Sequence, residues 1–245
     1  VLVPMAGDDT TPEGEQVNIY GNHVGSWNFA ATAYLNRWKV KIYYEHYFDD
    51  HSQMFFQYGR WKDGHIGLEI TFPKNRFIDT FVYEGLGTKD QTGPMLYDSF
   101  WGEFEEQISA KDNYYNHYLY QGWQHWGMGI GNPLLPGPIY NKNGQITFIS
   151  NRVLAHHIGF CGSPCQSLSY RMLLSYSRHW GTYDNPLNEI KKQFNSLFEV
   201  TYAPQQLKGW SFTVSGAMDR GSILGNNYGG MLVIRKQGII KSGNK

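Results

Sequence analysis

The sequence predicts an all-β fold, an antiparallel up-and-down transmembrane β-barrel of the outer-membrane kind. Two observations predict it. Apolar and polar residues alternate along about nine segments, as they do in strands with one lipid-facing side and one polar side. The connections between these segments are brief on one side and long on the other, which is typical of such barrels. We expect the brief turns on the periplasmic side and the long loops outside the cell.

The clearest strand covers residues 38–48. Its even-numbered positions are apolar or aromatic apart from His46, whereas Lys39, Lys41 and Glu45 occupy odd-numbered positions. The apolar spacing is two residues, so a helix, with its period of about 3.6 residues, is disfavoured. Charged residues in mid-strand are unusual in a soluble β-sandwich, the alternative fold, but a polar lumen tolerates them. This segment therefore favours a barrel, with the lysines and the glutamate facing its lumen.

Further segments have the same character, and many approach the ~9–11 residues with which a tilted strand crosses a bilayer. They are 27–35, 65–72, 77–85, 146–160, 168–177, 194–203, 210–219 and 228–235. Aromatic residues gather at the strand ends, as in the interfacial girdles of membrane barrels. The brief connections are 36–37, 73–76, 161–167 and 203–208, and the long ones are 49–64, 86–145 and 181–193.

The strand count bears on the domain organisation. Barrels built from one bacterial chain usually have an even number of strands, and an open sheet edge cannot face lipid. We therefore expect residues 1–245 to form one barrel domain that is the C-terminal portion of a larger barrel. The first residues also lack the pattern of a signal peptide. Within this domain, residues 86–145 are expected to form a long extracellular loop region.

Composition disfavours several classes of function. The 245 residues contain 21 Lys and Arg and 21 Asp and Glu, so no net positive charge favours a nucleic-acid partner. No apolar run approaches the ~18 residues of a membrane-spanning helix. Cys161 and Cys165 are interpreted as part of a turn with free or locally bridged thiols. We expect no cofactor.

Known catalytic motifs are missing from the sequence, which has no Gly-x-Ser-x-Gly elbow, no His-Glu-x-x-His and no Walker lysine. The cluster most like a metal site is 45–51, which we interpret as hydrogen-bonding groups at the lumen and loop edge, so no metal is expected. Ser175 or Ser177 beside His179 leaves a membrane-embedded hydrolase open as an alternative.

The segment 86–145 is the predicted place of function, because loops of this length in a compact domain are often functional. Ten aromatic residues lie between Tyr97 and Trp126, interleaved with carboxylate, amide and imidazole groups. Such a set suits sugars, whose C–H faces pack on rings and whose hydroxyls bond polar groups. The alternative is that the rings pack the loop on itself.

Several stretches together resemble a known family. The most specific is Trp123-Gln124-His125-Trp126-Gly127, and the full set is 43–52, 122–133, 179–183, 219–221 and 225–227. They are similar to capsule-assembly outer-membrane proteins of the Wzi type, in the variant of Bacteroides-like Gram-negative bacteria. The resemblance covers about residues 22–238. It implies an outer-membrane barrel of about 18 strands, twice those found here, with its long loops extracellular.

The resemblance also implies a function. Proteins of this type act as surface lectins that anchor capsular polysaccharide to the cell without catalysis. The expected partners are therefore capsular polysaccharide, outer-membrane lipid and other capsule-export proteins. A porin-like channel and an outer-membrane hydrolase are the alternatives. The residues expected to contact sugar, by ring stacking or by hydrogen bonding, are Trp101, Asp112, Asn113, Tyr114, Tyr115, Asn116, Trp123, His125 and Trp126.

Overall fold

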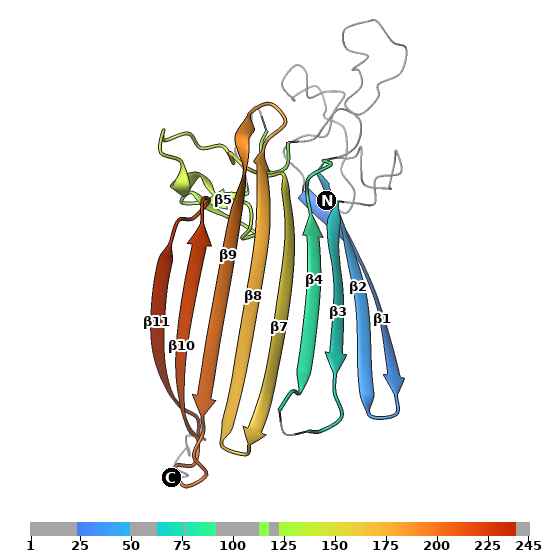
Figure 1. Cartoon of the computed structure of the whole chain (residues 1–245), viewed down its shortest axis with the longest axis vertical. Helices are drawn as coiled ribbons and strands as arrows, with labels where there is room; N and C mark the ends of the chain where they lie inside the picture. Colours follow the sequence, from blue (N-terminus) through green and yellow to red (C-terminus); the bar gives the residue numbers. More distant parts are fainter. Residues whose placement is uncertain (1–23, 50–62, 76, 92–112, 118–122, 239–245) are drawn as a thin grey trace, which may run out of the picture.

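The computed structural model describes residues 24–49, 63–75, 77–91, 113–117 and 123–238. Nine strands form one antiparallel sheet in which each strand pairs with its neighbours in chain order (Figure 1). The strands are β1 (Val24–Leu35), β2 (Trp38–Asp49), β3 (Gly64–Thr71), β4 (Thr80–Gly87), β7 (Val153–Cys165), β8 (Leu168–Gly181), β9 (Pro186–Tyr202), β10 (Trp210–Gly221) and β11 (Asn227–Lys236).

The predicted all-β, up-and-down arrangement of nine antiparallel strands is thus confirmed. The sheet is not closed, because in the described residues β1 pairs only with β2 and β11 only with β10. The described part of the connection between β4 and β7 carries two short strands, β5 (Gln124–His125) and β6 (Met128–Gly129), and one 3₁₀ turn, η4 (Pro138–Tyr140). No helix among the described residues has the length and apolar character to cross a membrane.

Three predicted connections were wrong. The long one extends further than expected, because β7 begins at Val153 and residues 146–152, predicted as strand, belong to the β4–β7 connection. Residues 161–165 belong to β7 rather than to a turn, and only residues 166–167 join β7 to β8. Pro164 can enter a strand here because the register shifts between Gly162 and Cys165, and such irregularities accommodate proline. On the other side, β9 begins at Pro186, so the expected loop 181–193 is a tight turn over residues 182–185.

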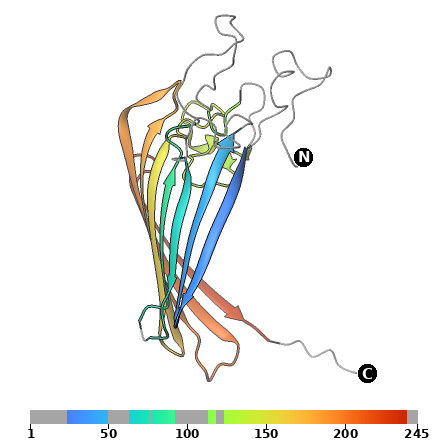
Figure 2. The same ribbon diagram turned by 90° about the vertical axis from the view of Figure 1, so that its right-hand side faces the viewer.

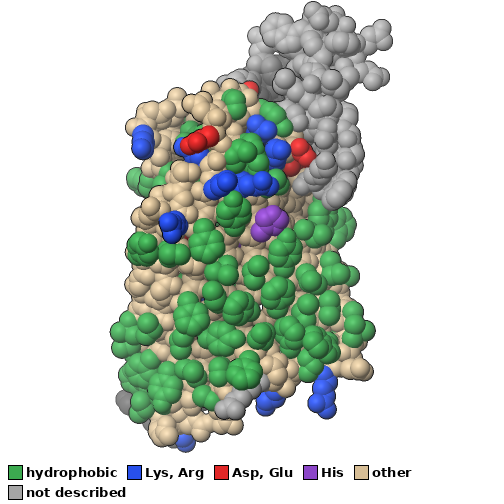
Figure 3. Space-filling view, in the orientation of Figure 1, with side chains coloured by type: hydrophobic (Ala, Val, Ile, Leu, Met, Phe, Trp, Pro, Cys, Tyr) green, Lys and Arg blue, Asp and Glu red, His purple; other side chains and the backbone are tan. Residues whose placement is uncertain are grey.

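The sheet is curved, with its two edge strands on the same side of the middle strands (Figure 2). Register places alternate side chains on two faces, and the convex face is apolar along every strand. Figure 3 shows this face covered by hydrophobic side chains over much of the strand length. Its members include Phe29, Ile42, Leu68, Phe81, Ile158, Leu174, Phe198, Val214 and Leu232.

The concave face is polar, and it carries Lys39, Lys41 and Glu45 as expected. Ion pairs and hydrogen bonds join its strands. The His65 ring lies between two carboxylates: its Nδ1 is 3.8 Å from Glu45 Oε2 and its Nε2 is 3.5 Å from Glu84 Oε1. A strand face lined with such groups needs water or polar partners rather than lipid.

The β4–β7 connection lies at one end of the sheet together with the β8–β9 and β10–β11 turns, and the opposite end, which carries the two-residue β1–β2 and β7–β8 turns, is called the tight-turn end here (Figure 1). The end that carries the β4–β7 connection is called the loop end here. The described part of that connection folds over the concave side of the sheet near this end (Figure 2). A small hydrophobic core forms where they meet, from Leu86, Tyr115, Leu135, Phe148, Val153 and Ala155. The sheet and the connection therefore form one packed unit at the loop end.

Candidate functional site

Residues 113–116 lie between two cavities at the loop end. Asn113 and Asn116 line one cavity, whose lining residues are mainly polar, and Tyr114 and Tyr115 line the other, whose surface is mainly apolar. Four consecutive residues thus divide between two environments. We call these the polar cavity and the aromatic cavity.

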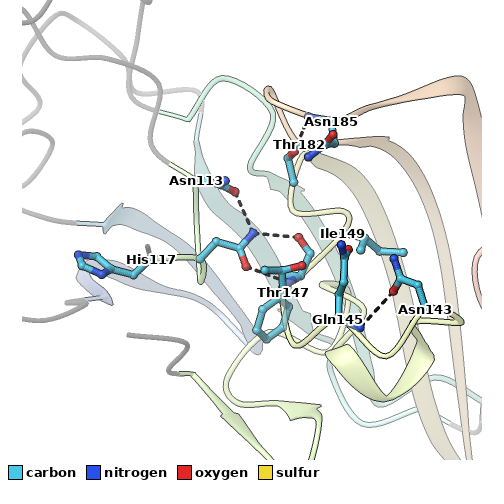
Figure 4. A pocket seen from close by; sticks show the side chains of 10 residues that line it. Asn113, His117, Asn143, Gln145, Thr147, Ile149, Thr182 and Asn185 are labelled. Atoms are coloured by element: carbon cyan, nitrogen blue, oxygen red, sulfur yellow. Dashed lines mark hydrogen bonds between the residues drawn. The ribbon is translucent and has the colours of Figure 1, made fainter. Parts of the chain in front are cut away.

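The polar cavity has a volume of about 720 Å³, within the range of small-molecule sites. It is lined by the end of the β4–β7 connection and by the β8–β9 turn (Figure 4). Amide and hydroxyl side chains dominate its wall. The lining residues are Asn113, Asn116, His117, Asn143, Gln145, Thr147, Phe148, Ile149, Thr182 and Asn185.

Part of this wall is held rigidly by its own hydrogen bonds. Asn116 Nδ2 donates to Phe148 O at 2.9 Å, and Phe148 N donates to Asn116 Oδ1 at 2.8 Å. The side-chain amide thus makes the two hydrogen bonds that the backbone of a neighbouring strand would make. Asn113 Oδ1 accepts from Asn116 Nδ2 at 2.9 Å and from the buried Asn151 Nδ2 at 2.6 Å. The two predicted asparagines are therefore brought together, and they shape the wall.

Other groups of the wall are available to a ligand. Within the part of the chain that the structure describes, the side-chain amides of Gln145 and Asn185 and the hydroxyl of Thr147 form no hydrogen bond. Ile149 adds an apolar surface that is 40% exposed. Free donors and acceptors beside an apolar patch are what a sugar ring requires, because its hydroxyls and its C–H faces must both find partners.

The aromatic cavity, of about 440 Å³, lies between the concave face of β1–β4 and the connection. Tyr115 stacks on Trp123, with ring centroids 6.2 Å apart, and meets the edge of Phe148 at 5.1 Å. Tyr115 is only 7% exposed and Tyr114 only 5%. The predicted residues Tyr114, Tyr115 and Trp123 therefore contribute to the packing of the connection. All three also line the aromatic cavity.

Asp63, immediately before β3, ties the connection to the sheet. Its carboxylate accepts hydrogen bonds from the backbone N–H of Asp90 at 2.9 Å, from that of Gln91, and from the Tyr114 hydroxyl at 3.0 Å. Asp63 is 1% exposed. Burial raises the pKa of this carboxyl from its ordinary value of 3.8 to about 6, although the three hydrogen bonds act to lower it. This anchor fixes the position of Tyr114 and so of both cavities.

His125 and Trp126 lie apart from the two cavities, on the β5–β6 hairpin. The Trp126 ring is 86% exposed, and the His125 ring meets it edge-on at 6.2 Å. Trp126 and Gly127 form the two central residues of the turn, with φ of 51° and 78°. Positive φ at both positions defines a type I′ turn, for which Asn-Gly is the preferred pair. An exposed tryptophan at this position goes against local preference.

The other predicted contacts, Trp101 and Asp112, lie outside the described residues. Sequence reasoning missed Gln145, Thr147, Asn185 and their neighbours, which supply the free groups of the polar cavity. One signal could have found them. The end of segment 86–145 and the connection after Gly181 both belong to the loop side of the meander, so they were expected at the same end of the barrel.

Of the two serine–histidine pairs considered in the sequence, the one between Ser177 and His179 forms a contact and the one between Ser175 and His179 does not. Ser177 Oγ lies 2.9 Å from His179 Nε2, and both side chains are buried, at 1% and 2% exposure. Ser175 Oγ instead lies 2.7 Å from His157 Nδ1. The other ring nitrogen of His179 lies 3.5 Å from Ser150 Oγ rather than next to a carboxylate. Among the described residues, no three His, Cys, Asp or Glu side chains are grouped so that they could hold a metal ion.

In comparisons with known proteins, no family model, no curated protein and no solved structure matches the chain.

Proposed function

We propose that the protein is an outer-membrane surface lectin, part of a larger barrel, that anchors capsular polysaccharide at the cell surface without catalysis. The observation that carries this proposal is the polar cavity at the loop end of a sheet whose convex face is apolar. An apolar exterior suits lipid, and an amide-lined cavity beyond its end suits a sugar in the water outside.

The membrane part of the proposal rests on the convex face. On β8 the residues of this face are apolar or aromatic from Leu168 to Tyr176. At ~3.4 Å per residue this run is about 27 Å along the strand, close to the ~25 Å apolar band of outer-membrane barrels. Aromatic rings gather at its tight-turn end, where Trp38 meets Phe72 at 5.0 Å and Phe160 meets Tyr170 at 6.3 Å. Such rings favour a membrane interface.

The two sheet edges support a larger barrel. β1 and β11 run in the same direction, because they are the first and last of nine antiparallel strands. Closing the sheet with antiparallel neighbours throughout therefore requires an odd number of additional strands. An 18-strand barrel, as the family resemblance implies, meets this condition and leaves no open edge in lipid.

The stretches that resemble the Wzi-type family also favour the loop end as the place of function. Those that the structure describes include the β5–β6 hairpin at 123–127, the end of β8 with its turn at 179–183, and the end of β10 at 219–221. The last two lie at the loop end by strand direction, because β8 and β10 both run toward it (Figure 1).

Binding to polysaccharide tests the proposal. The full-length protein, purified in detergent and placed in nanodiscs, should bind capsular polysaccharide from the bacterium that carries it. Changing Gln145→Ala and Asn185→Ala together should weaken binding about 10-fold or more, because two hydrogen-bonding groups are lost. The matched control is Gln237→Ala, which removes an exposed glutamine just after β11. Absence of binding by the wild type, or equal binding by the double variant, contradicts the proposal.

A porin-like channel is the second candidate, and the charged concave face favours it because such a face can line a water-filled lumen. Planar bilayers separate the two functions. A channel gives steady ion conductance when the full-length protein is inserted, whereas the proposed lectin, with its connection folded over the lumen side, gives none.

A further inference from the structure

Basic side chains gather at the loop end of the convex face, where they border the apolar surface (Figure 3). They come from the ends of three strands and from the residues that flank β4 and β7. We call this group the basic rim. Its members are Lys89, Arg152, Arg178, Lys192 and Arg220.

Three of these cations are neighbours in the sheet. Arg178 of β8 and Lys192 of β9 are direct cross-strand partners. Ser222, which follows β10, exchanges hydrogen bonds with Lys192, so Arg220 two residues earlier is its diagonal neighbour. Directly opposed residues have Cβ atoms only about 5 Å apart, and like charges in such pairs are destabilising. The sheet therefore concentrates positive charge at an energetic cost.

The other two members, Lys89 and Arg152, contact aromatic rings, and Arg178 shares one of these rings. The Trp180 ring lies 5.0 Å from Lys89 Nζ and 5.4 Å from the Arg178 guanidinium carbon. The Arg152 guanidinium lies 3.7 Å from the Tyr183 ring, and its Nε donates to Lys89 O at 3.3 Å. Cation–π contacts of this kind position the charges without neutralising them.

The cations of the basic rim are not paired with carboxylates in the part of the chain that the structure describes. In the described ranges, none of the five side chains forms an ion pair with a carboxylate, although such pairs form elsewhere, as between Arg171 and Glu199. The carboxylate closest in sequence to Arg220, Asp219, is on the concave face and accepts a hydrogen bond from Asn195 at 2.6 Å. A cluster of cations without internal partners is suited to an external anion.

The position of the basic rim identifies the anion. Tyr176 and Phe194 lie one step further along the same face and begin the apolar surface. A ligand that fits both regions has phosphate groups at the level of the rim and acyl chains along the strands. We propose that the basic rim binds the phosphorylated headgroup of an outer-leaflet glycolipid. This inference rests on the proposed contact of the convex face with the outer membrane.

The test compares ligands that differ in phosphate and in acyl chains. Full-length protein in non-ionic detergent is titrated with lipopolysaccharide, with dephosphorylated lipopolysaccharide and with inorganic phosphate. Lipopolysaccharide should bind, and removal of its phosphates should weaken binding about 10-fold or more, since each cation near a charged lipid surface contributes measurably. Competition by inorganic phosphate at millimolar concentration would instead assign the rim to a free anion and overturn the lipid proposal.

The variant for this test is the triple change Arg178→Gln, Lys192→Gln and Arg220→Gln. It should lose about 10- to 100-fold in affinity for lipopolysaccharide. The control, Arg37→Gln with Lys208→Gln, removes two exposed cations at the tight-turn end and should bind as the wild type does. The single variant Lys192→Gln, at an exposed position, serves if the triple variant does not fold. Equal affinity of the variants and wild type overturns the inference.

Polysaccharide binding and membrane insertion are measured on the same proteins. The inference is supported if rim variants still insert into the membrane and still bind polysaccharide but have lost affinity for lipopolysaccharide. A wild type that inserts and binds polysaccharide without preferring phosphorylated lipid overturns the inference alone. A wild type that does not enter lipid bilayers or bind polysaccharide contradicts the proposed function, whatever its affinity for lipopolysaccharide in detergent.

Discussion

The polar and aromatic cavities share the segment 113–116, yet their walls differ in how completely they are satisfied. In the aromatic cavity, Tyr115 stacks on Trp123 and also packs against Phe148, which is buried behind the polar cavity. In the polar cavity, Gln145, Thr147 and Asn185 have side-chain groups without a hydrogen-bond partner within the described chain. The difference separates two roles. The aromatic cavity contributes mainly to stability, and the polar cavity offers unused groups to a ligand, so substitutions should separate the two effects.

The largest expected effect comes from two adjacent residues that face opposite ways. Phe148 is 1% exposed in the core, whereas Ile149 is 40% exposed in the polar cavity. Phe148→Ala should lower the free energy of unfolding by about 3–5 kcal/mol, because it leaves a cavity among Tyr115 and its neighbours. Ile149→Ala should change it by less than about 0.5 kcal/mol. Denaturant unfolding of both variants measures this, and similar losses would remove the distinction between the buried core and the exposed cavity wall.

Asp63→Asn should have the next largest effect. All three groups that face the Asp63 carboxylate are donors, so an amide NH₂ in place of one oxygen leaves a buried backbone N–H without an acceptor. The expected loss is about 1–3 kcal/mol in the free energy of unfolding. Asp79→Asn is the control, because Asp79 accepts from Ser163 in an exposed hydrogen bond. Equal stability of both variants would show that Asp63 does not anchor the connection.

The same carboxyl should make stability depend on pH. Burial raises the pKa of Asp63 from 3.8 to about 6, so the folded state holds this proton more tightly than the unfolded state. Its contribution is therefore fully present below about pH 3.8 and is lost as the pH rises through about 6. As the pH rises through this window, the Tm of the wild type should fall relative to the Tm of Asp63→Asn. A difference that is constant from pH 3.5 to 7 contradicts the raised pKa.

The fold was largely predictable because alternation is local. On β2 each odd or even position shows its face directly in the sequence, and the nine strands follow from such runs. Two boundaries were not predictable from alternation. The start of β9 is mostly polar on both faces, with Ile190 as the one apolar residue from Asn188 to Lys192, since it extends past the apolar surface. The end of β7 contains Pro164, a residue that favours turns unless a register shift accommodates it.

The site was predictable only as a region. The sequence indicated segment 86–145, but it could not separate rings that pack from groups that remain free. Tyr115 is buried by Phe148, which is 33 positions later, and Asn116 is satisfied by the backbone of the same residue. Asn185 reaches the polar cavity from another connection altogether. Contacts of this range depend on tertiary structure, which residue type and spacing do not encode in a single sequence.

A smaller effect is expected at Thr147, whose hydroxyl is free in the polar cavity. Thr147→Val keeps the shape of the side chain and removes only the hydroxyl. Stability should change by less than about 0.5 kcal/mol, because no hydrogen bond within the described structure is lost. Affinity for capsular polysaccharide should fall by about 2- to 10-fold, as for one neutral hydrogen bond. Titration in nanodiscs measures this, and an unchanged affinity would exclude Thr147 from the contact.

An effect on stability of opposite sign is expected at Trp126. Its positive φ is costly for a bulky residue, and with 86% of its surface exposed the ring gains little from packing. Trp126→Asn creates the Asn-Gly pair that type I′ turns prefer, so it should stabilise the hairpin by less than about 1 kcal/mol. If the ring stacks on sugar, the same variant should bind polysaccharide more weakly. A gain in stability together with a loss of binding would show that Trp126, like the polar cavity, serves sugar binding at a cost in stability. A variant that gains stability and binds normally would show that the tryptophan has no role in recognition.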